Sequence, residues 1–272
     1  MDLVDYSQDI YETIKAEFKI LMNKRKFDEQ QIEFIPVSAL KGDNVANTSQ
    51  NMSWYSGKTL LQHLEKLNIE ADVNKDCTRF PIQMVVRPKT EEFHDFRGFA
   101  GKVLGGDLKV GDEVTVLPSL TTSRVKEIYF YDKKVDVATN RTSVLITLED
   151  EINISRGDMI VKSGNLPKVE KQFTATVSWM DSQKLVAGNR YILQHGVNKV
   201  LTKVKQINHC IQTDYSGIKL DVDSLKMNDI ASVDFQTNKP IFYDSFSENQ
   251  NNGAFILIDP KTNNTAGAGF IK

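Results

Sequence analysis

The sequence predicts a mainly β protein in which the last part of an α/β domain precedes two antiparallel β-barrels. Three observations support this prediction. Helical and apolar segments alternate through the first 70 or so residues, and short alternating apolar runs with Gly and Asn turns follow from about Asn68. Leu166-Pro167-Lys168 then divides those runs into two blocks. Many short strands that lie close together in sequence close most easily into barrels. The predicted units are 1–72, 78–166 and 168–272.

The first unit begins with a helical pattern over residues 7–22, for which Ser7 is a candidate N-cap. The apolar residues at helical spacing are Ile10, Ile14, Phe18 and Leu21. The apolar run Ile32–Val37 is predicted to be a buried strand that leads into a polar loop. A single strand cannot make a parallel sheet, so we expect its partner strands to come from residues outside this sequence.

The stretch W-Y-S-G-K-T-L-L, residues 54–61, resembles the end of a phosphate-binding loop. Such a loop needs a second glycine five positions before Gly57, and that position is Met52. No apolar strand leads directly into Gly57 either. We therefore interpret Lys58 and Thr59 as the first turn of a short amphipathic helix rather than as a phosphate site. Its apolar face would consist of Leu60, Leu61, Leu64 and Leu67.

Short alternating runs predict the strands of both barrels. In the first block these are residues 80–87, 97–104, 113–117, 124–131, 143–148 and 158–162. In the second block they are residues 173–179, 191–194, 199–211, 231–235, 240–244, 254–258 and 266–271. Residues 101–116 are predicted to form a hairpin that turns at Gly105-Gly106, with a second reversal at Gly111-Asp112.

Composition and charge exclude several classes of protein. The formal net charge of −2 argues against a protein whose main role is to bind nucleic-acid phosphates. No apolar run approaches the roughly 18 to 20 residues that cross a bilayer, and M-D-L-V-D-Y-S lacks the features of a secretory signal. Cys77 and Cys210 make no disulfide framework. We expect a cytoplasmic protein that binds neither nucleic acid nor membrane.

The sequence offers no metal site and no catalytic nucleophile. The four histidines, His63, His94, His195 and His209, show no metal-ligand spacing. His209 and its neighbour Cys210 would point to opposite faces of a strand. No Ser/His/Asp or Cys/His signature occurs in a recognisable local context. We therefore nominate no catalytic residue and no metal ligand.

Two arginines and both tryptophans have a structural and a functional interpretation. Arg156 in I-S-R-G-D is better explained as a turn residue than as a partner contact. Arg97, between two phenylalanines, is better explained as lying on the outer face of a barrel strand than as a partner or base contact. Trp54 and Trp179 are expected to pack rather than to anchor a ligand.

Two short motifs resemble the guanine-binding elements of the translation-factor-like GTPases. The opening M-D resembles the second half of Asn-Lys-Met-Asp, and V-S-A-L, residues 37–40, resembles the later Ser-Ala-Leu element. The resemblance implies that the Asp2 carboxylate accepts from guanine N1–H and its 2-amino group, which adenine cannot reproduce. It also implies that the Ala39 N–H contacts guanine O6. The predicted guanine-binding residues are therefore Asp2, Ser38, Ala39 and Leu40.

Longer phrases resemble one branch of that superfamily, the large GTPase subunit of bacterial sulfate adenylyltransferase. These phrases are residues 34–45, 54–61, 79–88, 95–101, 154–158 and 253–269. The resemblance implies that the first unit is the end of a P-loop GTPase domain, and that the barrels correspond to domains 2 and 3 of elongation factor Tu. It further implies that the complete subunit binds GTP and Mg²⁺. GTP hydrolysis would then drive a small catalytic subunit that makes adenosine 5′-phosphosulfate from ATP and sulfate.

The sequence departs from this family at its start. The phosphate loop, both switch segments, the Asp-x-x-Gly element and the Asn-Lys half of the guanine motif would all lie before Met1. We therefore expect an N-terminally truncated subunit that binds GTP negligibly by itself and hydrolyses none. The expected partner is the small catalytic subunit. The alternative is a fragment of a translation factor that binds tRNA or the ribosome, and an additional adenylylsulfate kinase domain in the full gene stays an open question.

Overall fold

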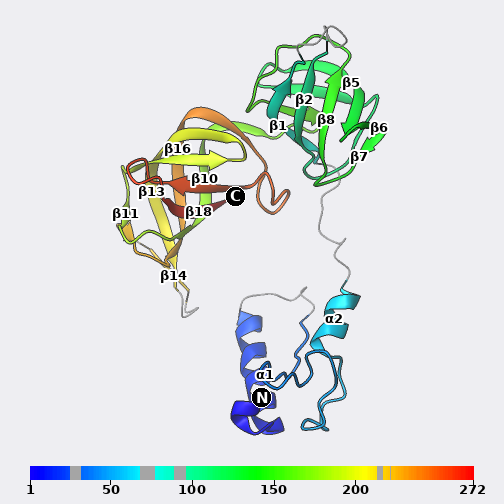
Figure 1. Ribbon diagram of the computed structural model, residues 1–272. Helices are drawn as coiled ribbons and strands as arrows, with labels where there is room; N and C mark the ends of the chain where they lie inside the picture. Colours follow the sequence, from blue (N-terminus) through cyan, green and yellow to red (C-terminus); the bar gives the residue numbers. More distant parts are fainter. Residues whose placement is uncertain (25–31, 68–76, 89–95, 213–216, 221) are drawn as a thin grey trace. The chain divides into compact units, whose positions relative to one another are not determined.

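The computed structural model describes residues 1–24, 32–67, 77–88, 96–212, 217–220 and 222–272 (Figure 1). The chain divides into two compact units, Met1–Asp72 and Val73–Lys272. Within these described residues, the helices all belong to the first unit and the strands all belong to the second. The fold is mainly β, as the sequence predicts.

The first unit contains a short 3-10 helix and two α-helices. These are η1 (Asp2–Val4), α1 (Gln8–Lys24) and α2 (Leu60–Lys66). The Ser7 hydroxyl accepts a hydrogen bond from the Ile10 N–H at 3.4 Å, which is the N-cap contact expected at the start of α1. Ile14 is 59% exposed, so the apolar side of α1 is not covered within the described unit.

Residues 32–37 do not form the buried strand that the sequence predicts. They are irregular, and Phe34 is only partly buried. Their carbonyl groups accept from side chains and from the chain terminus: Phe34 O from the Tyr11 hydroxyl, Pro36 O from the Asn44 amide and Val37 O from the Met1 amino group. The prediction fails because this segment has no neighbouring strand among the described residues, and a ladder needs one.

The segment that resembles a phosphate loop instead begins helix α2. Thr59 is the N-cap, and its hydroxyl accepts from the Gln62 N–H at 3.3 Å. The Gln62 side chain accepts from the Thr59 N–H at 3.2 Å, which completes a capping box. The prediction of a short helix is therefore confirmed, with the first helical residue at Leu60. Its leucines, Leu60, Leu61, Leu64 and Leu67, are 36–54% exposed.

The first barrel has six strands in its closed ring. They are β1 (Arg79–Val86), β2 (Gly98–Lys102), β4 (Glu113–Leu117), β5 (Thr121–Phe130), β8 (Ser143–Leu148) and β9 (Met159–Lys162). Their order is β4-β9-β1-β2-β8-β5, and pairing of β4 with β5 closes the ring. The short strands are β3 (Leu108–Lys109), β6 (Lys133–Val135) and β7 (Val137–Ala138). Alternate residues such as Phe80, Ile82 and Ile128 fill the interior.

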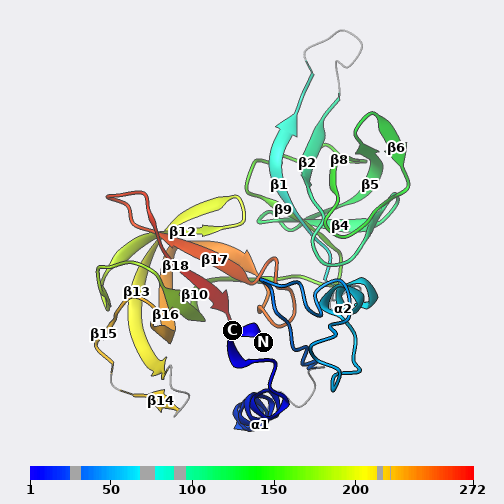
Figure 2. The same cartoon turned by 60° about the horizontal axis from the view of Figure 1, so that its bottom comes forward.

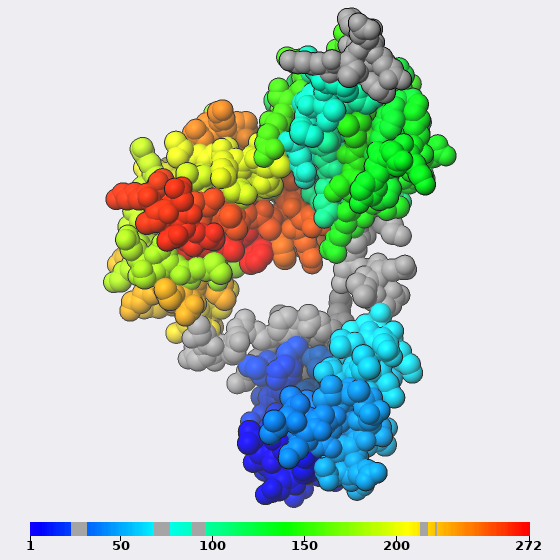
Figure 3. Space-filling model, viewed as in Figure 1, coloured from blue at the N-terminus to red at the C-terminus, as the bar shows by residue number. Residues whose placement is uncertain are grey.

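The second barrel closes in the same way. Its ring consists of β10 (Lys168–Trp179), β12 (Arg190–His195), β13 (Asn198–Ile211), β16 (Ile230–Tyr243), β17 (Ala254–Ile258) and β18 (Thr265–Ile271). The short strands are β11 (Leu185–Val186), β14 (Ile218–Lys219) and β15 (Ser224–Leu225). The order β12-β17-β18-β10-β16-β13 is closed by β12 and β13 (Figure 2). Phe173, Phe235 and Phe255 pack together inside it. The space-filling view shows the last residues, in red, on its surface (Figure 3).

Two predictions about strand connectivity are wrong. Residues 101–116 do not form a hairpin, because β2 pairs with β1 and β8 whereas β4 pairs with β5 and β9. Gly105 and Gly111 do turn the chain, with φ of 84° and 83°. The two predicted strands at 231–235 and 240–244 are one long strand, β16. These pairings are set by closure of the barrels, which brings together strands that are distant in sequence. Local turn signals therefore could not predict them.

Candidate functional site

The structure brings Asp2 and Ser38 into direct contact although 36 positions separate them. The Ser38 hydroxyl donates to Asp2 Oδ1 at 2.6 Å. Ser38 is completely buried, and the Lys41 N–H donates to its hydroxyl oxygen at 3.2 Å. The serine is therefore held in place from two sides, and it orients the carboxylate at the start of η1.

This contact also favours the ionised form of the Asp2 carboxyl. The hydrogen bond from Ser38 is the main cause that lowers the pKa of the Asp2 carboxyl below its usual value, followed by a backbone hydrogen bond. Burial acts in the opposite direction. The Met1 amino group lies 3.6 Å from Asp2 Oδ1, and no described side chain other than Ser38 donates a hydrogen bond to the carboxylate. The site thus presents an ionised carboxylate with one oxygen available to a donor.

Ala39 and Leu40 follow Ser38 at the protein surface. Both are exposed, and Leu40 is 82% exposed. Among the described residues, nothing accepts a hydrogen bond from the Ala39 N–H. The site therefore offers a carboxylate oxygen of Asp2 and the backbone N–H of Ala39, which directly follows the serine that contacts Asp2. These are the two kinds of group that a guanine edge requires.

A second carboxylate supports the loop after Ser38, and the sequence reasoning missed it. Asp43 accepts from the Ser49 hydroxyl at 2.6 Å and from the Tyr6 hydroxyl at 2.9 Å. The Ser49 hydrogen bond lowers the pKa of Asp43, and the bond to Asp43 raises the pKa of Tyr6. The Ser38 N–H donates to Asp43 O at 3.1 Å. Its only sequence signal was its place in the phrase K-G-D-N-V, residues 41–45.

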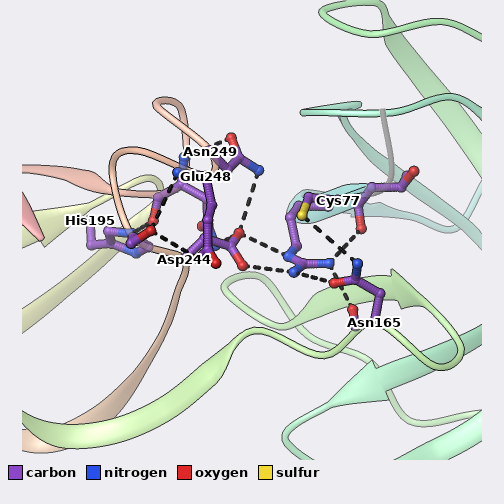
Figure 4. A network of polar contacts seen from close by, with 10 residues as sticks. Cys77, Asn165, His195, Asp244, Glu248 and Asn249 are labelled. Atoms are coloured by element: carbon purple, nitrogen blue, oxygen red, sulfur yellow. Dashed lines mark hydrogen bonds and ion pairs between the residues drawn. The ribbon is translucent and has the colours of Figure 1, made fainter. Parts of the chain in front are cut away.

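The barrels meet through a buried ion pair that the sequence did not reveal (Figure 4). Arg79 of β1 donates to both carboxylate oxygens of Asp244, which follows β16, at 2.7 and 2.9 Å. Asn165 accepts from Arg79 Nη1 with its backbone oxygen and from Nη2 with its side-chain oxygen, and Thr78 O accepts from Nη1 as well. Asn252 Nδ2 donates to Asp244 Oδ2 at 2.8 Å. The network satisfies both charges inside the protein.

Several residues with an open interpretation prove to be structural. Trp179 is buried, and its indole N–H donates to Gln183 O at 2.7 Å. Trp54 packs against Tyr11 and donates to Tyr6 O. Within the described part of the chain, no group of three His, Cys, Asp or Glu side chains is arranged to hold a metal ion. No helix in that part is long and apolar enough to cross a membrane.

Two solved structures have a fold similar to that of this chain. Sup35 bound to GMPPNP aligns with a TM-score of 0.66 over 98% of this chain and 65% of that protein, at 18% identity. Sup35 bound to GDP aligns with a TM-score of 0.65 over the same shares of the two chains. The family described as "GTP-eEF1A C-terminal domain-like" matches residues 172–272, which form the second barrel. The solved structures thus share the fold of this chain, and the second barrel resembles the domain that the family model describes.

Curated sequences are far more similar. Sulfate adenylyltransferase subunit 1 of Colwellia psychrerythraea is 42% identical over 272 residues, which is all of this chain and 57% of that protein. This chain is similar in sequence to sulfate adenylyltransferase subunit 1 along its whole length. The subunit 1 of Psychromonas ingrahamii is 40% identical over 271 residues. The bifunctional enzyme CysN/CysC of Rhodopirellula baltica is 39% identical, and the chain covers 41% of it. The chain thus spans a little over half the length of the subunit 1 relatives it matches.

Proposed function

We propose that this chain belongs to a cytoplasmic sulfate adenylyltransferase and forms a part of its GTP-binding regulatory subunit. The complete subunit would couple GTP hydrolysis to the synthesis of adenosine 5′-phosphosulfate from ATP and sulfate by a small catalytic subunit. The observation that supports this proposal is identity of 39–42% to subunit 1 relatives along the whole chain. Alignment to the solved Sup35 structures reaches only 18% identity and supports the fold alone.

The geometry of the first unit supports a role in guanine recognition. An ionised Asp2 carboxylate, oriented by Ser38, would accept from guanine N1–H and from the 2-amino group. Adenine offers no such pair of donors, so the site would select the base. The Ala39 N–H would donate to guanine O6. In the complete subunit, other segments would hold the phosphates and Mg²⁺, because this sequence contains no Gly-x-x-x-x-Gly-Lys-Ser/Thr loop.

The barrels supply the second part of the proposal. Formation of a phosphosulfate anhydride is strongly uphill, which is a physical reason to couple it to a second hydrolysis. Coupling needs a surface whose contacts differ between two states of the GTPase. We assign that surface to the barrels, because the buried Arg79–Asp244 pair holds them together so that they would transmit motion as one body.

A binding experiment with two ligands tests the proposal. The chain would be titrated with the small catalytic subunit of sulfate adenylyltransferase from the same source and, separately, with bulk tRNA, both at physiological ionic strength. Saturable binding of the small subunit without retention of tRNA is the expected result. Retention of tRNA alone would replace the proposal with a translation-factor function, because the salt concentration used suppresses nonspecific phosphate binding.

A further inference from the structure

An open groove on the first barrel combines three arginines with an incomplete strand edge. The groove has a volume of about 630 Å³. Its walls come from the end of β1, the start of β2 and the turn before β9. The residues that carry the argument are Gln83, Met84, Arg87, Arg97 and Arg156. We call it the arginine groove.

One wall of the arginine groove is the edge of β1. Strand β1 pairs with β9 only over Arg79–Pro81, whereas its pairing with β2 continues to Val86 (Figure 2). The backbone of Gln83–Val86 therefore has a described strand neighbour on one side only. Unpaired edges of this kind are places where an extended segment of another chain adds a strand. Met84 is 57% exposed beside this edge, and methionine adapts to irregular apolar partners.

The arginines concentrate positive charge around that edge. Arg156 donates to Gln83 O at 2.7 Å, and Arg97 donates to Asn153 Oδ1 and Ile154 O at 3.3 and 3.2 Å. None of the three guanidinium groups forms an ion pair with a carboxylate of a described residue. Burial and then the nearby charge of Arg87 lower the pKa of Arg97, whereas Glu151 partly offsets them. An anionic ligand would reduce the repulsion between these neighbouring guanidinium groups.

We propose that the arginine groove binds an extended, carboxylate-rich segment of a partner protein, which adds as a strand along Met84–Val86 of β1. The strand edge favours a peptide over a nucleic acid, because an extended peptide supplies alternating donors and acceptors that match the edge, whereas a phosphate backbone supplies acceptors only. The carboxylates would form bidentate contacts with the exposed Arg87 and with Arg156. Within the proposed function, the partner is the small catalytic subunit, so that part of the inference rests on the proposed function.

Charge-changing variants in the groove provide the first test. R87Q is the primary variant because Arg87 is exposed and makes no intramolecular hydrogen bond with a described residue, so the fold should survive. The double variant R87Q/R156Q is expected to weaken binding of the small subunit about tenfold or more. K133Q, in β6 outside the groove, makes the same single charge change as R87Q at an exposed site and should leave affinity unchanged. Equal affinity of wild type and R87Q/R156Q would overturn the inference and leave the proposed function standing.

A second probe separates failure of the inference from failure of the proposed function. If the small subunit does not bind wild type, the proposed function fails, and a fluorescent peptide of alternating Glu and Val residues then tests the groove by anisotropy. Saturable binding that R87Q/R156Q abolishes supports the groove, and absence of binding overturns it. Hydrogen exchange of the bound complex should show new protection of those amides of Met84–Val86 that do not already pair with β2. Binding of tRNA that depends on these arginines would also overturn the proposal.

Discussion

Arg79 and Asp244 form a bidentate ion pair across the junction of the two barrels, although 165 positions separate them. Their side chains are only 1% and 6% exposed. Water therefore does not screen the pair, and each charge depends on the other for its solvation. This relationship differs from the Arg124–Glu113 pair on the first barrel, where both side chains are more than half exposed.

The substitution D244A is expected to destabilise the protein by about 3–5 kcal/mol, because it leaves the Arg79 charge buried without a partner. Urea denaturation of the 272-residue chain measures the change. The matched variant E113A removes one partner of the exposed Arg124 pair and should cost less than about 1 kcal/mol. Equal effects of the two substitutions would show that the barrel junction does not depend on the buried pair.

Two glycines with the same backbone conformation should differ sharply in their tolerance of alanine. A Cβ at Gly105 would lie 1.9 Å from the carbonyl oxygen of Cys77, whereas a Cβ at Gly111 meets nothing within 4 Å. Both have φ near +84°. G111A is expected to cost about 1–2 kcal/mol from backbone conformation alone, and G105A about 4 kcal/mol or more. Thermal denaturation of both variants tests the difference, and similar melting temperatures would contradict it.

Buried His195 should make the protein less stable in mild acid. Its Nε2 lies 2.8 Å from Asn252 O, so the neutral ring donates there. Burial is the main cause that lowers the pKa of His195, while the Asn252 contact and Asp244 act in the opposite direction. The folded-state pKa therefore lies below the unfolded value of about 6.5. Protonation favours the unfolded chain, and stability falls as the pH drops through about 6.5 toward the folded pKa.

Replacement by glutamine tests this origin of the pH dependence. Glutamine keeps an N–H donor but does not titrate, so H195Q should lose less stability than wild type between pH 7 and pH 5.5. Denaturation at pH 8, where the imidazole is neutral in both states, isolates the cost of the substitution itself. Parallel stability curves for the two proteins across this pH range would assign the acid sensitivity to other groups.

The Asp2–Ser38 contact predicts a selective change in one titration. S38A removes the hydrogen bond that contributes most to the lowered pKa of Asp2, so that pKa should rise. Carboxyl carbon NMR follows the titration directly. S49A is the matched control, because Ser49 contacts Asp43 and its loss should raise the pKa of Asp43 instead. An Asp2 titration that is the same in S38A and wild type would remove the physical basis for the proposed base site.

The 272-residue chain by itself should not bind GTP tightly. The sequence contains two elements of a guanine site but no phosphate-binding loop. The backbone N–H groups and the lysine that would bind the triphosphate are therefore missing from it. Titration with a fluorescent GTP analogue in the presence of Mg²⁺ should show no saturation in the micromolar range, and no phosphate should be released. Micromolar saturation would mean that other residues of this chain hold the phosphates.

Local patterns in the sequence determined most elements of this protein. Period-two alternation specified strands such as Glu113–Leu117 and Ser143–Leu148 to the residue, and the Thr59 capping box began α2 where the apolar helix pattern starts. Longer phrases identified the subunit 1 relatives. These patterns extend over about ten residues, so they can be recognised in the sequence without knowledge of the tertiary contacts.

Only the tertiary structure decided which distant residues meet. It paired β2 with β8 rather than with the strand that follows, left residues 32–37 without a ladder, and joined Asp2 to Ser38 and Arg79 to Asp244. It also placed Arg87, Arg97 and Arg156 around an edge of β1 that has no strand neighbour among the described residues. The reason is physical: barrel closure and the desolvation of a buried charge depend on the whole set of neighbours in space, which no local pattern of side chains encodes.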